Sequence, residues 1–367
     1  MAAAFGYCGP MSPEIWTLGV GLPKLAVRQA AAAERAGFDG LAIVDSQNLS
    51  GDPYVALALA AQATERIKLA TGVTNPLTRH PAVTASAIAT VQAESGGRAV
   101  LGIGRGDSAL AHLGLAPAPV SVFERYLAQL QTYLRGEGLS LAEASSQLGR
   151  NPALETLGLA GTPPDSRLHW LRATQKKVPV DVAATGPKVI AAAARHAERI
   201  TFAVGADLAR LRWAIDTARA ARKAAGLDPE TLGLGAYLNV VAHPDPRQAL
   251  RLAEGGVASF ARFSVMHGRV QGPAGEQEKE VLERVHQAYD MRRHTMTGTP
   301  QAAQLTDEFA ESFAILGPSD YCAARLREIS ALGLTKLVLI GPSAGADPAQ
   351  ATAAMARLAG EVLPALR

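Results

Sequence analysis

Short apolar runs alternate with longer, alanine-rich segments of helical period along most of the chain. The clearest example is the stretch 69–107, where an apolar run ends at Thr74 and Asn75, an alanine-rich segment follows, and a second apolar run ends at Asp107. A strand, a helix and a second strand in this order predict a βαβ unit. Both predicted strands end in small or polar residues, and α/β proteins carry their functional groups at the carboxyl ends of parallel strands. The stretch therefore predicts one repeat of a parallel α/β fold with a candidate site at one end.

The same alternation continues to the end of the chain and predicts a closed barrel. Alternating strands and helices joined by short loops indicate a parallel sheet with right-handed crossovers, and the count closes at the eight strands of a (β/α)₈ TIM barrel. The segment between the first predicted strand and the first predicted helix is expected to be a loop, because Pro10, Pro13 and Pro23 interrupt it. The predicted strands are 3–7, 40–45, 67–73, 99–104, 178–184, 199–204, 232–241 and 336–340, and the predicted helices are 25–36, 53–63, 82–94, 122–134, 187–196, 208–225, 319–332 and 347–366.

Two segments depart from this regular pattern. Residues 135–177 contain scattered Gly, Pro and Ser and are longer than a compact crossover needs, so we expect an insertion on the active-site side of the barrel. Residues 246–313 are helical and more polar, with a break at 268–275, and are expected to pack beside or over the barrel. The sequence therefore predicts a single barrel domain over 1–367 with two insertions.

Composition narrows the possible partners and compartments. The chain has 36 basic and 33 acidic residues and no basic block with interleaved aromatics, so a nucleic-acid partner is not expected. Its two cysteines, Cys8 and Cys322, have no metal-ligand spacing and suit a reducing cytosol. The first eleven residues lack the pattern of a signal peptide, and no apolar run reaches the roughly 18 to 20 residues of a membrane span. We therefore expect a cytoplasmic protein that does not bind membranes.

The residues at the carboxyl ends of the predicted strands mix small side chains with few acids and bases. Such a set suits a large flat ring lying close to the backbone better than a metal cage or a nucleophilic triad. The histidines elsewhere share no ligand spacing, so no metal site is expected. The strand-end residues are Tyr7, Asp45, Gly72, Val73, Thr74, Asn75, Arg105, Gly106, Asp107, Thr185, Gly186, Pro187, Lys188, Val204, Gly205, Asn239, Gly341, Pro342 and Ser343.

Asp107 ends a glycine-rich run that superficially resembles a dinucleotide-binding loop. That pattern needs a third glycine where Asp107 stands, and a carboxylate there would repel a pyrophosphate. We interpret Gly104 and Gly106 as a tight turn that aims Asp107 into the barrel mouth. The alternative is that Asp107 only caps the next helix.

The run from Thr185 to Lys188 joins a predicted strand to a predicted helix. Free backbone N–H groups, a hydroxyl and an ammonium are the components of an anion site at a helix amino terminus. The alternative is ordinary capping by Thr185, with Pro187 in the first turn.

Two other positions have a simple default interpretation. Gly72 and Val73 either end their strand or form a bulge into the barrel. Arg79 and His80 precede Pro81, which favours extended geometry, and we expect them to be a solvated loop pair.

Several of these motifs together resemble the luciferase-like monooxygenase family. The resemblance is closest to its branch that uses the deazaflavin coenzyme F420, which includes methylenetetrahydromethanopterin reductase. It extends over nearly the whole chain, and the block 71–107 is its most specific part. The matching segments are 44–45, 70–76, 79–85, 102–107, 184–188, 317–319 and 333–340.

The resemblance implies a barrel with insertions and assigns cofactor contacts. Gly72 and Val73 should be joined by a non-prolyl cis peptide that bulges against the central ring of the deazaflavin. The segment from Thr185 to Lys188 should hold the coenzyme phosphate. The ring and its side chain should be lined by Asp45, Thr74, Asn75, Gly106, Asp107 and Val204.

The resemblance also implies hydride transfer between C5 of the deazaflavin and a small organic substrate, such as an imine, an enone or a pterin-like C–N bond. Asp107 and Tyr7 are the candidate proton donors, and Asp45 is a third catalytic candidate. Sugar-phosphate dehydrogenases of the family carry histidine where this chain has Ser46, which argues against that substrate.

Two other functions remain open at this point. One is an FMN-dependent monooxygenase supplied with reduced flavin by a partner reductase, and the other is a barrel that has lost catalysis. Relatives are commonly dimers, so a homodimer is expected, with an F420 or flavin reductase as functional partner.

Overall fold

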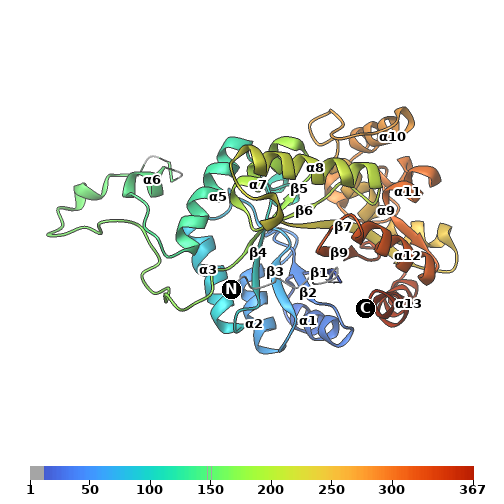
Figure 1. The fold of residues 1–367 in the computed structure, drawn as a ribbon, viewed down its shortest axis with the longest axis horizontal. Helices are drawn as coiled ribbons and strands as arrows, with labels where there is room; N and C mark the ends of the chain where they lie inside the picture. Colours follow the sequence, from blue (N-terminus) through green and yellow to red (C-terminus); the bar gives the residue numbers. More distant parts are fainter. Residues whose placement is uncertain (1–11, 147, 150) are drawn as a thin grey trace, which may run out of the picture.

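The computed structural model describes residues 12–146, 148–149 and 151–367, and it confirms the predicted eight-stranded parallel barrel (Figure 1). The strands pair in chain order, and β9 closes the ring by pairing with both β7 and β1. The barrel strands are β1 (Glu14–Gly19), β2 (Gly40–Ile43), β3 (Lys68–Thr71), β4 (Ala99–Ile103), β5 (Val180–Ala184), β6 (Arg199–Phe202), β7 (Gly233–Ala242) and β9 (Lys336–Ile340).

Helices surround this ring and bury their alanine-rich faces against it. Local signals set their starts: Asp52 caps α2 by accepting from the Tyr54 and Val55 amides, and Asp207 caps α8 in the same way. The outer helices are α1 (Leu25–Arg35), α2 (Pro53–Gln62), α3 (Pro81–Glu94), α5 (Val120–Leu134), α7 (Pro187–His196), α8 (Leu208–Ala224), α12 (Ser319–Ser330) and α13 (Pro348–Arg357), which continues into η5 (Leu358–Val362) and α14 (Leu363–Ala365). Short helices are α4 (Ser108–Ala111) and η2 (Pro229–Thr231).

The first barrel strand is β1, in the segment that was predicted to be a loop. The predicted strand 3–7 lies outside the described residues, and its assignment as the first barrel strand is wrong. The prolines flank β1 and do not interrupt it, because Pro13 precedes its first residue and Pro23 follows its last. Trp16 of β1 fills the barrel interior beside Gly40, where an added Cβ would lie 2.1 Å from the indole.

A ninth strand, β8 (Ile315–Gly317), was not predicted. It pairs with the carboxyl-terminal end of β7, beyond the part of β7 that pairs within the barrel. A strand of three residues carries too little periodicity to be recognised.

The segment 135–177 does not lie on the active-site side of the barrel, so that prediction was wrong. It forms an arm that projects beside α3 and α5 (Figure 1), with α6 (Leu141–Ser145) and η1 (Leu154–Leu157). Its contacts are with the outer helices: Gln129 of α5 donates to the Glu143 carbonyl, and Gln175 donates to the Ala89 carbonyl of α3. The arm joins α5 to β5, and such αβ connections reach the amino ends of barrel strands.

The segment 246–313 packs over the barrel, as expected. It contains α9 (Pro246–Phe263), α10 (Glu276–Gln287), η3 (Met291–Arg293), η4 (Ala302–Gln304) and α11 (Asp307–Phe313). Phe260 and Phe263 of α9 pack against the interior cluster that includes Trp16 and Tyr237. Among the described residues, no helix is long and apolar enough to cross a membrane.

The amino end of the barrel interior is filled by a buried ion pair. Lys336 Nζ lies 2.8 Å from Asp181 Oδ2, and both side chains are 3% exposed. Thr201 donates to the same carboxylate, and Lys336 Nζ lies 3.8 Å from the Trp16 ring centroid. This end of the barrel is closed, so a ligand must enter from the carboxyl ends of the strands.

Candidate functional site

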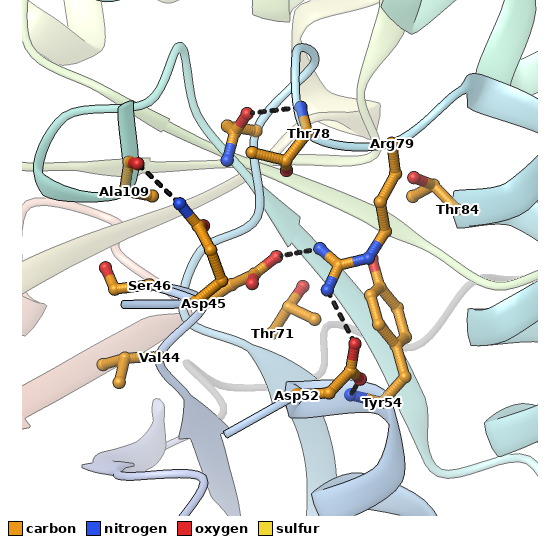
Figure 2. A network of polar contacts seen from close by, with 12 residues as sticks. Val44, Asp45, Ser46, Asp52, Tyr54, Thr71, Thr78, Arg79, Thr84 and Ala109 are labelled. Carbon is orange, nitrogen blue, oxygen red and sulfur yellow. Dashed lines mark hydrogen bonds and ion pairs between the residues drawn. The ribbon is translucent and has the colours of Figure 1, made fainter. Parts of the chain in front are cut away.

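Asp45 follows β2 and is held by an arginine from the next βα loop. Arg79 Nη1 lies 2.6 Å from Asp45 Oδ2, and Arg79 Nη2 lies 2.8 Å from Asp52 Oδ2 (Figure 2). The guanidinium also stacks over the Tyr54 ring, at 4.9 Å from the centroid. Burial opposes the charge on Arg79, but the Asp45 and Asp52 carboxylates outweigh it and raise the pKa of Arg79. The Asp45 carboxylate is therefore occupied in fixing the wall of the mouth.

The expectation that Arg79 and His80 form a solvated loop pair was wrong. The Arg79 side chain is only 17% exposed. His80 caps α3 by accepting from the Ala82 amide at Nδ1, and its Nε2 lies 2.7 Å from the Ala144 carbonyl. Extended backbone before Pro81 was expected correctly, but Arg79 pairs with Asp45 and Asp52, and His80 Nε2 contacts the Ala144 carbonyl, so distant parts of the chain hold both side chains.

The Gly72–Val73 peptide bond is cis, which confirms the expectation from the family resemblance. The Gly72 amide donates to the Ile43 carbonyl at 2.7 Å, and an added Cβ at Gly72 would lie 2.8 Å from Ala42 Cβ. On the other side, an added Cβ at Gly104 would lie 3.2 Å from Val73 Cγ2. Glycine at both positions lets the backbones of β2, β3 and β4 approach closely around Val73.

Thr74 and Asn75 are buried immediately after this bond. Asn75 Oδ1 accepts from the Leu77 and Thr78 amides, which forms a local turn. Its Nδ2 is buried and makes no hydrogen bond within the described part of the chain. A buried amide donor without a partner is uncommon in folded proteins, so Asn75 has a donor available for a ligand.

Asp107 stands at the start of α4 but does not cap it, so the capping alternative does not apply. Its carboxylate accepts from Nη2 of Arg262 on α9. Gly106 has a φ of +87°, and an added Cβ there would lie 2.5 Å from Leu110 Cδ1, so this tight turn requires glycine. Ser108 next to it contacts Ser46 at 2.9 Å between hydroxyl oxygens, which links the loops after β2 and β4.

Three residues around Asp107 were missed by the sequence reasoning. Arg262, Tyr289 and His294 all come from the segment 246–313, where no motif marked them. The guanidinium carbon of Arg262 lies 4.4 Å from the Tyr289 ring centroid, and the Tyr289 hydroxyl lies 2.6 Å from His294 Nδ1. More than 150 residues separate Asp107 from Arg262, so no local pattern indicates the contact.

The run from Thr185 to Lys188 leads into α7, where Pro187 carries no N–H and the Val189 amide donates to the Gly186 carbonyl at 3.1 Å. Gly186 is the cap residue and provides no side-chain cap, while the Thr185 hydroxyl donates to the Ala203 carbonyl at 3.3 Å. The capping alternative for Thr185 is therefore not what the structure has. Lys188 is exposed and has no ion-pair partner among the described residues. The Gln271 side chain lies beside Gly186, where an added Cβ would be 3.6 Å from its Oε1.

Val204 and Tyr7 complete the predicted set. Val204 is buried after β6, and its carbonyl accepts from Arg210 Nε at 3.0 Å. Arg210 also donates to the Gln271 and Pro273 carbonyls, which fixes the segment 271–273 next to the start of α7. Tyr7 lies outside the described residues.

The structure therefore brings most of the predicted residues to one end of four neighbouring strands. Asp45 follows β2, Thr74 and Asn75 follow β3, Asp107 follows β4 and Lys188 lies at the start of the helix after β5. No group of three or more His, Cys, Asp or Glu side chains suited to a metal ion occurs within 12–146, 148–149 and 151–367. The mouth combines a glycine-lined wall, an unpaired amide donor, a carboxylate and a helix amino terminus, which suits a flat ring carrying an anionic tail.

Known proteins match the chain over most of its length. It is 28% identical over 323 residues to 5,10-methylenetetrahydromethanopterin reductase of Methanolobus tindarius, covering 86% of this chain and 90% of that protein. It is 26% identical over 349 residues to phthiodiolone/phenolphthiodiolone dimycocerosates ketoreductase of Mycobacterium tuberculosis, covering 91% and 85% of the two chains.

A similar fold occurs in the solved structure of the coenzyme F420-dependent tetrahydromethanopterin reductase from Methanopyrus kandleri. The TM-score is 0.71 with 22% sequence identity, over 97% of this chain and 100% of that one. At this identity the likeness is one of fold. Residues 10–336 match the luciferase-like monooxygenase family, and this range contains the barrel strands β1 to β7 and the strand-end residues Asp45, Asn75, Asp107 and Lys188. The chain therefore belongs to the luciferase-like monooxygenase family, whose members are oxidoreductases.

Proposed function

We propose that this protein is a coenzyme F420-dependent oxidoreductase. It transfers a hydride between C5 of the deazaflavin and a small organic substrate with an imine, an enone or a pterin-like C–N bond. The observation that carries the proposal is the buried, unpaired Nδ2 of Asn75 directly after the glycine-lined wall at Gly72 and Val73. One of the relatives named above is a coenzyme F420-dependent tetrahydromethanopterin reductase, which supports the same choice of coenzyme.

The described residues fit the proposed coenzyme at both of its ends. Gly72, Val73 and Gly106 line a wall that lets a flat ring approach the backbone, and Asn75 supplies a donor to a ring carbonyl. The start of α7 supplies the positive end of the helix dipole, and Lys188 supplies an ammonium, for the phosphate. Thr74, Thr185, Gly186, Pro187 and Val204 complete the proposed contacts.

The bound coenzyme supplies hydride chemistry at its C5 carbon. Asp107 holds or moves the accompanying proton at its carboxylate, because it is the carboxylate beside the turn at Gly106. Asp45 acts through Arg79, whose guanidinium spans Asp45 and Asp52 and braces the wall behind the ring. Tyr7 remains a second proposed proton donor.

The test of this proposal is a titration of the purified protein with F420 and, separately, with FMN, followed by fluorescence. Binding of F420 with no comparable binding of FMN supports it. Tight binding of FMN with none of F420 would contradict it and favour a monooxygenase that receives reduced flavin from a partner reductase. F420 binding without turnover of any imine, enone or pterin-like C–N bond in a substrate screen would favour a non-catalytic barrel.

We also infer that the protein works as a homodimer in the cytoplasm and relies on a separate reductase for its reduced coenzyme. Val55 and Leu59 of α2 and Val83 of α3 are 61%, 54% and 55% exposed, which leaves an apolar face suited to a second copy. Cys322 is a free, buried thiol, as expected in a reducing compartment.

A further inference from the structure

Asp107 is held by a guanidinium that comes from the second half of the chain. Its carboxylate accepts from Nη2 of Arg262, and the two residues are 155 positions apart. The exposed fractions of the side chains are 18% for Asp107 and 9% for Arg262. The direction in which the carboxylate points is therefore set by where α9 places Arg262.

The Arg262 guanidinium packs mainly against aromatic rings. Its guanidinium carbon lies 4.4 Å from the Tyr289 ring centroid and 5.7 Å from that of Phe263. A guanidinium over an aromatic face is attracted by the ring quadrupole. The Arg262 Nε is buried and makes no hydrogen bond within the described ranges, so the Tyr289 ring and Asp107 are its principal supports.

The Tyr289 hydroxyl is fixed on two sides. It lies 2.8 Å from Ser259 Oγ and 2.6 Å from His294 Nδ1. Burial raises the pKa of Tyr289 and lowers the pKa of His294, so both rings are neutral near pH 7. In that state the phenol can donate to Nδ1 of His294 and accept from Ser259, which satisfies both bonds.

We propose that Arg262 is a positioning residue for Asp107, and that Tyr289, anchored by Ser259 and His294, fixes Arg262 in turn. The catalytic consequence rests on the proposed function, whereas the pairing does not. Because α9 also carries Phe260 and Phe263 onto the barrel interior, one helix both covers the mouth and orients its carboxylate.

The main experiment is a double-mutant cycle between Asp107 and Arg262. We expect D107N and R262Q each to lower kcat at least tenfold, with a much smaller change in F420 affinity measured by fluorescence. The kcat of the double variant should lie within threefold of the kcat of D107N, because Arg262 has nothing to orient once the carboxylate is gone. R251Q is the control, because it makes the same change of charge at an exposed position of α9. Its kcat should stay within twofold of that of the unmodified protein.

The role of the Tyr289 ring in holding Arg262 is tested by two substitutions of different severity. Y289F keeps the ring beneath the guanidinium and should lower kcat by less than fivefold. Y289L removes the ring and should approach the loss seen in R262Q. R262K keeps the charge without the planar fork and serves as the arginine variant if R262Q does not fold.

Three results would overturn the proposal. Losses in kcat that multiply in the double variant would mean that Arg262 acts independently of Asp107. A raised KM with unchanged kcat in R262Q would make Arg262 a substrate-binding residue. If the unmodified protein binds no F420, the proposed function fails; in that case, or if it turns over none of the screened substrates, the cycle is read from thermal unfolding midpoints. The pairing is supported if the double variant lowers the unfolding midpoint by less than the sum of the shifts in D107N and R262Q. It is contradicted if the two shifts add.

Discussion

Asp45 and Asp107 follow β2 and β4, and each carboxylate binds a guanidinium that its own loop does not provide. Arg79 reaches Asp45 from the loop after β3, and Arg262 reaches Asp107 from α9. The sequence predicts where each carboxylate lies, because a polar residue at the end of an apolar strand is a local signal. It does not predict the partner, because that depends on how distant elements pack. The sequence therefore identified both aspartates as candidates, but it did not identify the arginines that orient them.

Lys188 is the residue on which the proposed phosphate site depends most directly. Lys188→Ala should weaken F420 binding by about 1–2 kcal/mol, because a charge-assisted bond to the phosphate is lost. Fluorescence titration measures this. Lys223→Ala, at an exposed position near the end of α8, is the matched control and should leave the affinity unchanged. Equal affinities for Lys188→Ala and the unmodified protein would remove Lys188 from the site.

Among the elements, most helix and strand positions follow from periodicity, and the exceptions have identifiable causes. β1 was missed because its flanking prolines suggest a loop, although its apolar residues pair with β2 and β9. β8 is too short to show a period. The arm 135–177 was recognised as irregular but assigned to the wrong end of the barrel, because sequence length does not indicate the direction in which an insertion projects.

The ion pair of Lys336 and Asp181 joins β9 to β5 across the barrel interior, and breaking it should destabilise the fold. Burial lowers the pKa of Lys336, and Asp181 opposes this effect. Asp181→Asn should lower the free energy of unfolding by about 3–5 kcal/mol, because the ammonium would remain buried without a carboxylate. Chemical denaturation measures the change. Asp216→Asn, an exposed position on α8, should change it by less than about 0.5 kcal/mol, and a similar small effect at Asp181 would contradict the expectation.

For the whole molecule, the exposed apolar residues of α2 and α3 predict the oligomeric state. Sedimentation equilibrium should give about twice the chain mass of 38.2 kDa. Val55→Lys combined with Leu59→Lys should yield monomers, because two buried charges would oppose association. Leu157→Lys is the control, since Leu157 lies on the arm and is 65% exposed. A monomeric unmodified protein, or a charged α2 variant that remains dimeric, would contradict this assignment.

The sequence by itself determined the barrel class, most of its elements, the family and the strand-end residues, because periodicity, turn residues and short motifs are local properties of a chain. The cis bond at Gly72–Val73 was also expected from the motif and is present. Only the tertiary structure decided that Arg79 braces Asp45, that Arg262 and Tyr289 lie behind Asp107, and that β1 opens the barrel. These features depend on contacts between residues far apart in the chain, and the free energy of such contacts is fixed by packing rather than by neighbouring residues.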